Sequence, residues 1–189
     1  MAKVYVFLAN GFEDVEALIP VDVLRRGGVE VVTVSVVEDT QVVETAHKVQ
    51  VVADAMFDDC DFSDADLLML PGGMPGASNL NAHEGVRQAL LKQNAAGKRV
   101  AAICAAPLVL GGLGILRKKR ATCYPGFEQT LEGATYTGDL CTVDGNVTTG
   151  EGPAAAFPFA YSLLAQLVDE QTAQQIAVGM RYAHLMEKR

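Results

Sequence analysis

The chain has 189 residues, half of them hydrophobic and a fifth charged, which excludes a disordered protein and predicts a single domain over residues 1–189. Its net charge of −8 at pH 7 opposes binding to nucleic acid or to an anionic membrane, and no apolar run is long enough to span a bilayer. The four cysteines form no CxxC pair, so zinc and dithiol chemistry are not indicated and a reducing cytoplasm is predicted.

The first part of the chain alternates between predicted strands and predicted helices. A hairpin is expected over 38–53, added at one edge of the sheet. The alternation of strands and helices predicts a mostly parallel sheet with helices on both faces and right-handed crossovers. The expected strands are 3–9, 29–37, 66–70 and 99–103, and the expected helices are 14–26, 84–96 and 106–113.

The second part of the chain is less regular. Short strands are expected over 121–124 and 134–136, and a hairpin over 140–148 that turns at the Asp-Gly pair 144–145. Pro153 is expected to open a helix over 154–167, in which Pro158 should distort the first turns. A last helix is expected over 171–186.

Cys104 stands where the apolar strand over 99–103 gives way to a small-residue helix start at Pro107. Such a junction resembles a nucleophile elbow, a tight turn that lifts one side chain above the carboxyl end of a parallel sheet. The amides and dipole of the following helix favour an anion, so the pKa of the Cys104 thiol is predicted to fall below its free value of about 8.5. The alternative is that Cys104 is only a small core residue.

Five separated motifs follow one another along the chain: GFEDVEA at 11–17, PVDVLRR at 20–26, LPGG at 70–73, AAICAAP at 101–107 and Gly-Pro at 152–153. In this order they resemble the ThiJ/PfpI superfamily and, within it, the DJ-type branch that includes bacterial members. The resemblance covers nearly the whole chain and implies a flavodoxin-like three-layer α/β sandwich that forms a homodimer. No cofactor and no metal ion are expected.

The resemblance also implies that a carboxylic acid from the first helix accompanies the cysteine, and by position that acid is Glu16. A charged carboxylate would repel a thiolate, so the pair is favourable only if Glu16 keeps a proton and donates it to sulfur. The two groups are then expected to titrate as a coupled unit. The backbone N–H groups of Gly73 and Ala105 are expected to converge on one oxygen as an oxyanion hole. The alternative is that Glu16 is an exposed helix carboxylate.

Gly72, His47 and Tyr124 are predicted to border the pocket, and the chain departs from the family's pattern around it. Peptidases of the superfamily carry a histidine directly after the cysteine, where this chain has Ala105. Animal DJ-type proteins carry a histidine where this chain has Tyr124, and the family places an anion-binding arginine near His47. An imidazole binds anions less dependably than a guanidinium, and His47 could instead be a solvated hairpin residue.

These residues predict a cysteine-dependent stress-response protein that acts on small reactive carbonyls or on their protein adducts, like the glyoxalase and deglycase activities assigned to the family. A second hypothesis is a redox sensor or redox-regulated chaperone in which Glu16 hydrogen-bonds a sulfinate on Cys104. Peptidase or amidase action is disfavoured, because acyl transfer needs a general base near the thiol. Packing alone is expected of the remaining cysteines, Cys60, Cys123 and Cys141.

Overall fold

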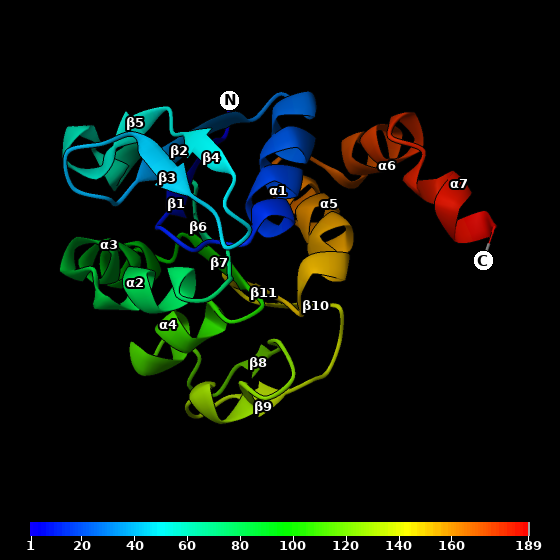
Figure 1. Cartoon of the computed structure of the whole chain (residues 1–189). Helices are drawn as coiled ribbons and strands as arrows, with labels where there is room; N and C mark the ends of the chain where they lie inside the picture. Colours follow the sequence, from blue (N-terminus) through cyan, green and yellow to red (C-terminus); the bar gives the residue numbers. More distant parts are fainter. Residues whose placement is uncertain (189) are drawn as a thin grey trace.

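The computed structural model describes residues 1–188, and a seven-stranded sheet runs through its middle (Figure 1). The strand order is β10-β11-β7-β6-β1-β2-β5. All neighbours pair in parallel except β10 and β11, which form an antiparallel hairpin. The strands are β1 (Lys3–Leu8), β2 (Glu30–Ser35), β5 (Ala55–Met56), β6 (Leu67–Leu70), β7 (Arg99–Ile103), β10 (Cys141–Asp144) and β11 (Val147–Gly150).

Helices cover both faces of the sheet, which confirms the predicted three-layer α/β architecture (Figure 1). One face carries α1 (Asp14–Arg26) and α5 (Ala156–Leu167), which pack against each other. The other carries α2 (Gly76–Ala82), α3 (Glu84–Ala95) and α4 (Pro107–Gly112). Beyond α5, the helices α6 (Glu170–Gly179) and α7 (Tyr182–Glu187) project from the body as an arm.

The central strands are apolar along their whole length because helices cover both of their faces. All four residues of β6 are fully buried, and every residue of β1 after Lys3 is buried. Such continuous apolar runs are typical of parallel strands. The register of three adjacent strands, β1, β6 and β7, therefore brings their carboxyl ends to one edge of the sheet.

The hairpin expected over 38–53 forms, but not where it was predicted. Strands β3 (Val42–Glu44) and β4 (Gln50–Val52) pair with each other in a separate two-stranded sheet. The edge position beside β2 belongs to β5 instead. The hairpin joins the body through a bridge between Thr45 and Phe12, which places it over the start of α1. The prediction that the hairpin extends the edge of the main sheet was wrong. Alternating polarity indicates that two strands form a hairpin, but it does not indicate which sheet the hairpin joins.

The helix expected over 171–186 is two helices. Arg181 adopts a left-handed conformation with φ of 64°, and this interrupts the helix between α6 and α7. Helix α2 was not predicted, because its sequence GASNLNA contains residues of weak helix propensity. By contrast, α5 runs through Pro158, since a 3-10 turn at Pro153–Ala155 precedes it and Pro158 lies in its first turn, where backbone N–H groups need no helical partner.

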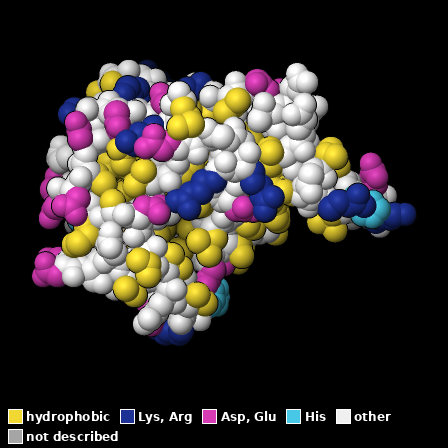
Figure 2. All heavy atoms as spheres, turned by 90° about the horizontal axis from the view of Figure 1, so that it is seen from above, with side chains coloured by type: hydrophobic (Ala, Val, Ile, Leu, Met, Phe, Trp, Pro, Cys, Tyr) yellow, Lys and Arg dark blue, Asp and Glu magenta, His cyan; other side chains and the backbone are white. Residues whose placement is uncertain are grey.

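The two short strands predicted in the second part pair with each other as β8 (Arg120–Ala121) and β9 (Thr135–Tyr136), in parallel. Within residues 1–188, no helix combines the length and the apolar character that crossing a bilayer requires. On the face seen in Figure 2, Lys and Arg side chains lie among Asp and Glu side chains, and no continuous basic stripe covers it.

Candidate active site

The candidate site lies where the order of strands in the sheet reverses direction. From β1 the chain adds β2 and β5 on one side, and then β6, β7 and β11 on the other. Ligands of open α/β sheets bind at such a switch point, outside the carboxyl ends of the strands. Three segments meet there: the start of α1 after β1, the glycine pair Gly72 and Gly73 after β6, and Cys104 directly after β7.

Cys104 occupies a strained turn between β7 and α4. Its φ is 65°, a left-handed conformation that non-glycine residues rarely adopt. Two hydrogen bonds hold the turn: the Cys104 amide donates to Gly150 O at 2.9 Å, and Cys104 O accepts from the Tyr124 amide at 2.9 Å. The residue is 8% exposed. Strain that the surroundings enforce in this way is typical of functional sites, so the core-residue alternative for Cys104 is disfavoured.

Glu16 lies in the first turn of α1 and is fully buried, so the exposed-carboxylate alternative is wrong. Its Oε2 accepts a hydrogen bond from the Gly72 amide at 3.0 Å, whereas its Oε1 has no hydrogen-bond partner among residues 1–188. A Cβ atom added to Gly72 would lie 2.5 Å from Glu16 Oε2 and 2.7 Å from Cys104 Cβ. The glycine thus lets the acid and the cysteine approach each other.

The electrostatics of the pair differ from the prediction for the thiol. Burial raises the pKa of Glu16 to about 7, against opposing contributions from Cys104 and the Gly72 amide. Burial, followed by the negative charge of the nearby Glu16 carboxylate, raises the pKa of Cys104 to about 12. The predicted fall below the free value therefore fails beside a charged Glu16, because burial and repulsion outweigh the backbone amides that favour the thiolate.

Those amides belong to Gly73 and Ala105, and both act on the sulfur by lowering the pKa of Cys104. Gly73 has a φ of 85°, and a Cβ atom there would lie 2.6 Å from Gly11 O, so only glycine fits. The structure thus brings both predicted amides to Cys104. Their role towards a substrate oxygen stays a prediction.

His47 extends from the β3–β4 hairpin and pairs with the first turn of α1. Its Nδ1 lies 2.6 Å from Asp14 Oδ2, and Asp14 Oδ1 accepts from Thr45 Oγ1 at 2.8 Å. The Asp14 carboxylate raises the pKa of His47 above its ordinary value, which favours the imidazolium. Within residues 1–188, Glu13, Asp14 and His47 also hold side-chain ligand atoms within 4.8 Å of one another, but an imidazolium at His47 cannot ligate a cation.

Tyr124 and Glu13 complete the surroundings of the pair. Tyr124 is 46% exposed, and its ring lies against Gly152, where an added Cβ atom would be 3.1 Å from Tyr124 Cδ2. Glu13 caps α1 by accepting from the Glu16 amide at 2.9 Å, and its charge helps to raise the pKa of Glu16. Sequence reasoning missed this role, although an acidic residue three positions before Glu16 is a recognisable capping signal.

The other cysteines lie outside this arrangement, and all four thiols of the chain are free. Cys123 is fully buried beside the site, and burial raises its pKa to about 11. Cys141 is half-buried in β10, and Cys60 lies in the loop before β6. Burial raises the pKa of both thiols.

A family model described as the DJ-1/PfpI family matches residues 2–166. The chain belongs to the DJ-1/PfpI family. It is 39% identical over 177 residues to protein DJ-1 homolog B of Arabidopsis thaliana, a match that covers 93% of this chain and 40% of that protein. The chain therefore spans less than half the length of that relative.

One further relative and two solved structures of the family match along most of their length. The glutathione-independent glyoxalase DJR-1.2 of Caenorhabditis elegans is 33% identical over 157 residues, with 82% of each chain covered. Oxidized DJ-1 of Toxoplasma gondii has a TM-score of 0.91 and 35% identity, with 95% of this chain and 98% of that chain covered. A mutant of a DJ-1 superfamily protein of Salmonella typhimurium also has a TM-score of 0.91, with 33% identity and the same coverage. These matches confirm the family and the flavodoxin-like fold.

Replacing Glu16 with glutamine is expected to change the pH dependence of stability. In the wild type the pKa of Glu16 is about 7 in the folded state against an ordinary 4.5, so the folded state binds the extra proton between these values. The free energy of unfolding therefore falls as the pH rises from 4.5 to 7, by about 3 kcal/mol.

Glu16→Gln stays neutral at every pH and keeps an acceptor for the Gly72 amide. We expect the variant to be more stable than the wild type above pH 7 and to lose this advantage towards pH 4.5. Chemical denaturation on both sides of this interval measures the difference. A wild-type unfolding free energy that does not change across it would contradict the prediction.

Proposed function

We propose that this protein converts small reactive carbonyls, with an α-oxoaldehyde such as methylglyoxal as the substrate class, and that Cys104 is the nucleophile. The observation that carries the proposal is the strained turn at Cys104 with the buried acid Glu16 beside it. The exposed fraction of Cys104, only 8%, favours a small reactant over a protein adduct. The name of the glyoxalase relative supports the same chemistry.

In this proposal the pair holds one proton in the reactive state, and Glu16 carries it. A proton on Glu16 removes two of the causes that raise the pKa of Cys104, namely the carboxylate charge and its role as hydrogen-bond acceptor. The protonated Oε1, which lacks another partner among residues 1–188, then becomes a donor to the thiolate. The amides of Gly73 and Ala105 act in the same direction. Glu16 is suited to this state because its pKa is raised to about 7.

The reaction begins when the Cys104 thiolate attacks the aldehyde carbon, and the oxyanion that forms takes the proton from Glu16 to give a hemithioacetal. The amides of Gly73 and Ala105 stabilise the developing negative charge. The Glu16 carboxylate next removes the proton on the former aldehyde carbon, while the hydroxyl proton on that carbon passes to the neighbouring carbonyl oxygen, which gives an enediol. Glu16 then returns its proton to the neighbouring carbon, the C=O bond re-forms next to sulfur, and a thioester with a 2-hydroxyl group results. Water hydrolyses the thioester to a 2-hydroxy acid and restores Cys104 and the proton on Glu16.

Incubating the wild-type protein with methylglyoxal, without added thiol, tests the proposal. We expect methylglyoxal to disappear and lactate to form in equal amounts, and we expect prior alkylation of Cys104 to stop the reaction. The matched control is Cys60→Ser, which removes another partly accessible thiol and should leave turnover unchanged. Methylglyoxal loss without lactate, or turnover that survives complete alkylation of Cys104, would contradict the proposal.

A redox sensor is the second candidate, because the unpartnered Oε1 belongs to the buried Glu16 carboxyl group that lies beside Cys104. A protonated Glu16 would donate a hydrogen bond to a sulfinate on Cys104 and make that state stable. Mass spectrometry after mild peroxide treatment separates the candidates. Addition of two oxygens at Cys104 alone, in a protein that does not turn over methylglyoxal, would favour the sensor.

The proposal includes a homodimer in a reducing cytoplasm. Apolar side chains remain exposed beside the site, with Val15 39% and Leu18 40% exposed on α1 and Val52 69% exposed on β4. A second copy covering this surface would bury them. We expect sedimentation to give twice the monomer mass, and Leu18→Glu to shift the protein towards monomer. The four free cysteines support the reducing compartment.

A further inference from the structure

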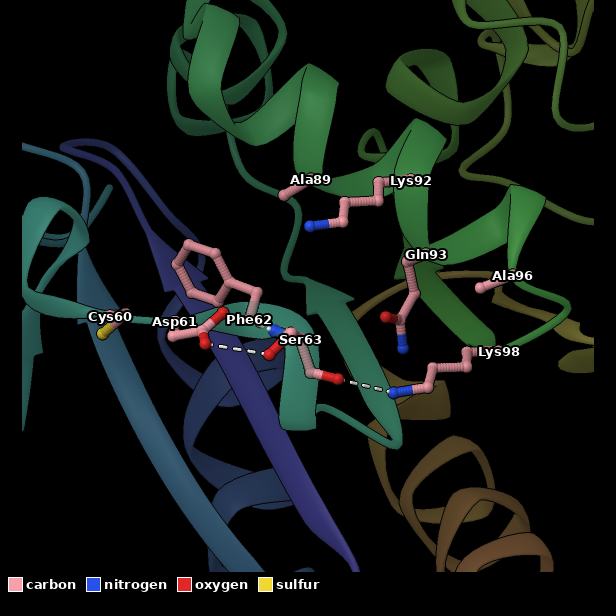
Figure 3. Close-up of a pocket in the computed structure, with 9 residues that line it drawn as sticks. All are labelled: Cys60, Asp61, Phe62, Ser63, Ala89, Lys92, Gln93, Ala96 and Lys98. Carbon is pink, nitrogen blue, oxygen red and sulfur yellow. Dashed lines mark hydrogen bonds between the residues drawn. The ribbon is translucent and has the colours of Figure 1, made fainter.

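A cavity of about 300 Å³ lies between the 3-10 turn at Phe62–Asp64 and helix α3 (Figure 3). It is at the end of the sheet opposite to Cys104, because the segments that line it lead into the amino ends of β6 and β7. A second cavity, of about 420 Å³, joins it along α3. The residues common to both are Cys60, Phe62, Ala89 and Lys92. We call the two together the α3 groove.

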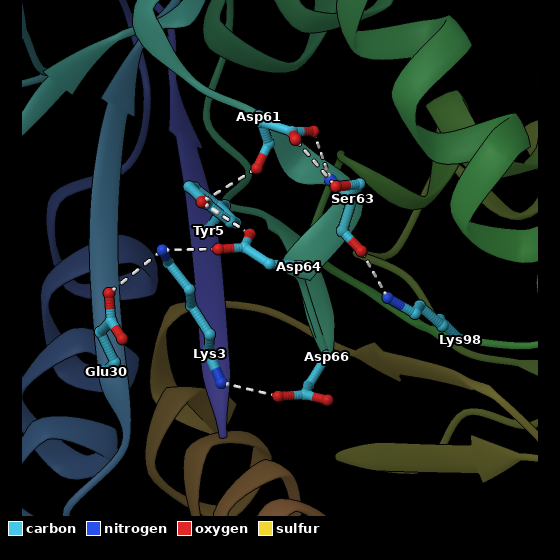
Figure 4. Close-up of polar contacts among 8 residues, drawn as sticks. All are labelled: Lys3, Tyr5, Glu30, Asp61, Ser63, Asp64, Asp66 and Lys98. Atoms are coloured by element: carbon cyan, nitrogen blue, oxygen red, sulfur yellow. Dashed lines mark hydrogen bonds and ion pairs between the residues drawn. The ribbon is translucent and has the colours of Figure 1, made fainter. Parts of the chain in front are cut away.

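The wall of the α3 groove opposite to α3 is held in place by polar contacts (Figure 4). The Tyr5 hydroxyl donates to Asp61 O at 3.2 Å and to the Asp64 carboxylate at 2.9 Å. The Lys98 ammonium donates to Ser63 O at 2.8 Å. These contacts tie the loop to β1 and to the residue before β7. The groove is therefore a fixed feature of the fold, as small-molecule sites usually are.

Gln93 places an unsatisfied acceptor in the groove. The residue is only 5% exposed, and its Nε2 donates to Ala65 O at 3.2 Å and to Arg99 O at 3.3 Å. These two carbonyls determine which end of the amide is the nitrogen. Oε1 accepts no hydrogen bond from residues 1–188, and the side chain lines the cavity (Figure 3). This oxygen is not one of the fully buried unpartnered atoms, so water can reach it, and a ligand that supplies an N–H donor can take the place of that water.

Charges of both signs line the same cavity. The Lys92 ammonium has no ion-pair or hydrogen-bond partner in the described part of the chain, and Lys98 bonds a neutral carbonyl. On the opposite wall, Asp61 accepts from the Ser63 amide and hydroxyl at 2.9 Å each, which lowers its pKa and keeps it charged. A simple anion would meet Asp61 and a simple cation would meet the lysines. The charges therefore suit a ligand that carries both signs.

Apolar side chains form a further part of the lining. The Phe62 ring packs at centroid distances of 5.0 to 5.1 Å against the rings of Tyr5, Phe7 and Phe57, so it offers a rigid flat wall. Ala89, on α3, leaves space beside this ring. An apolar side chain of moderate size fits between the two.

We propose that the α3 groove binds a free α-amino acid with an apolar side chain. Its carboxylate faces Lys92 and Lys98. Its ammonium donates to Gln93 Oε1 and faces Asp61. Its side chain packs against Phe62. This site is separate from Cys104 and does not depend on the proposed carbonyl chemistry.

Calorimetric titration with three related probes tests the proposal. L-Phenylalanine carries both charges, L-phenylalaninamide lacks the carboxylate, and N-acetyl-L-phenylalanine lacks the ammonium. We expect saturable binding of L-phenylalanine and about tenfold weaker binding of each of the other two. Equal affinity for all three probes, or no saturation with L-phenylalanine by about 10 mM, would overturn the proposal.

Two charge variants locate the ligand's groups. Lys92→Gln is expected to weaken the binding of L-phenylalanine about fivefold and to leave the affinity for L-phenylalaninamide unchanged. Asp61→Asn keeps an acceptor for the Ser63 amide. It is expected to weaken the binding of L-phenylalanine but not the binding of N-acetyl-L-phenylalanine. The matched control, Lys188→Gln, removes an exposed positive charge from the end of the arm and should bind like the wild type. Wild-type affinity for L-phenylalanine in both Lys92→Gln and Asp61→Asn would also overturn the proposal.

Cys60 gives an independent readout because the residue lines both cavities. Saturating L-phenylalanine is expected to slow alkylation of Cys60 and to leave alkylation of Cys104 unchanged, as followed by peptide mass spectrometry. Binding should also persist in Cys104→Ser. Protection of Cys104 instead of Cys60 would place the amino acid in the active site and refute the assignment.

Discussion

Replacing Cys104 with serine is expected to lower kcat/KM for methylglyoxal by about 10³-fold or more. A serine hydroxyl does not ionise near neutral pH, and the residue that follows it is Ala105 rather than a histidine that could serve as its base. The substitution changes only the sulfur atom, so the turn held by Gly150 and Tyr124 should persist. The loss would therefore report the nucleophile and not a collapsed site.

Two further variants serve as comparisons for Cys104→Ser. Glu16→Gln keeps the acceptor for the Gly72 amide but cannot transfer a proton, so we expect kcat/KM to fall by about 10²- to 10⁴-fold. Cys60→Ser, at the opposite end of the sheet, should match the wild type. Initial rates of lactate formation measure all three proteins. Activity of Cys104→Ser within about twofold of the wild type would remove the basis of the proposed mechanism.

Replacing Gly73 with alanine is expected to destabilise the fold by about 3 to 4 kcal/mol. Gly73 has a φ of 85°, which strains any residue with a Cβ atom. That atom would also overlap the backbone of residues 11–13, including Gly11 O at 2.6 Å and Phe12 C at 2.8 Å. Backbone atoms cannot move aside as a flexible side chain can, so both costs remain.

Gly97→Ala is the matched control for the Gly73 substitution. Gly97 has a φ of 69°, but an added Cβ atom would meet nothing within 4 Å. This variant carries the conformational strain without the overlap and should lose only about 1 kcal/mol. Urea denaturation of both variants at one pH gives the comparison. Equal losses would show that the segment at 11–13 yields to the new methyl group and that Gly73 is not required for close packing.

Much of the fold could be predicted because local patterns and long-range packing agree in it. The helix over 14–26 and the strand over 99–103 have the predicted bounds, since a capped amphipathic helix and a buried apolar run are local signals. The edge position of the hairpin and the continuous last helix were predicted wrongly. Strand partners are chosen by contacts between distant segments, and the only local mark of the break at Arg181 is Gly179, a single glycine that a helical pattern can tolerate.

The residues that gather at the carboxyl edge of the sheet could be read from the chain, because strand ends and motifs are local features. Their charge states depend on the folded molecule: burial raises the pKa of Glu16, burial and the nearby Glu16 carboxylate raise the pKa of Cys104, and burial depends on segments far apart in sequence. The α3 groove likewise had no local signal. Gln93, Lys92 and Asp61 become neighbours only when the loop before β6 folds against α3, so their combined chemistry exists only in three dimensions.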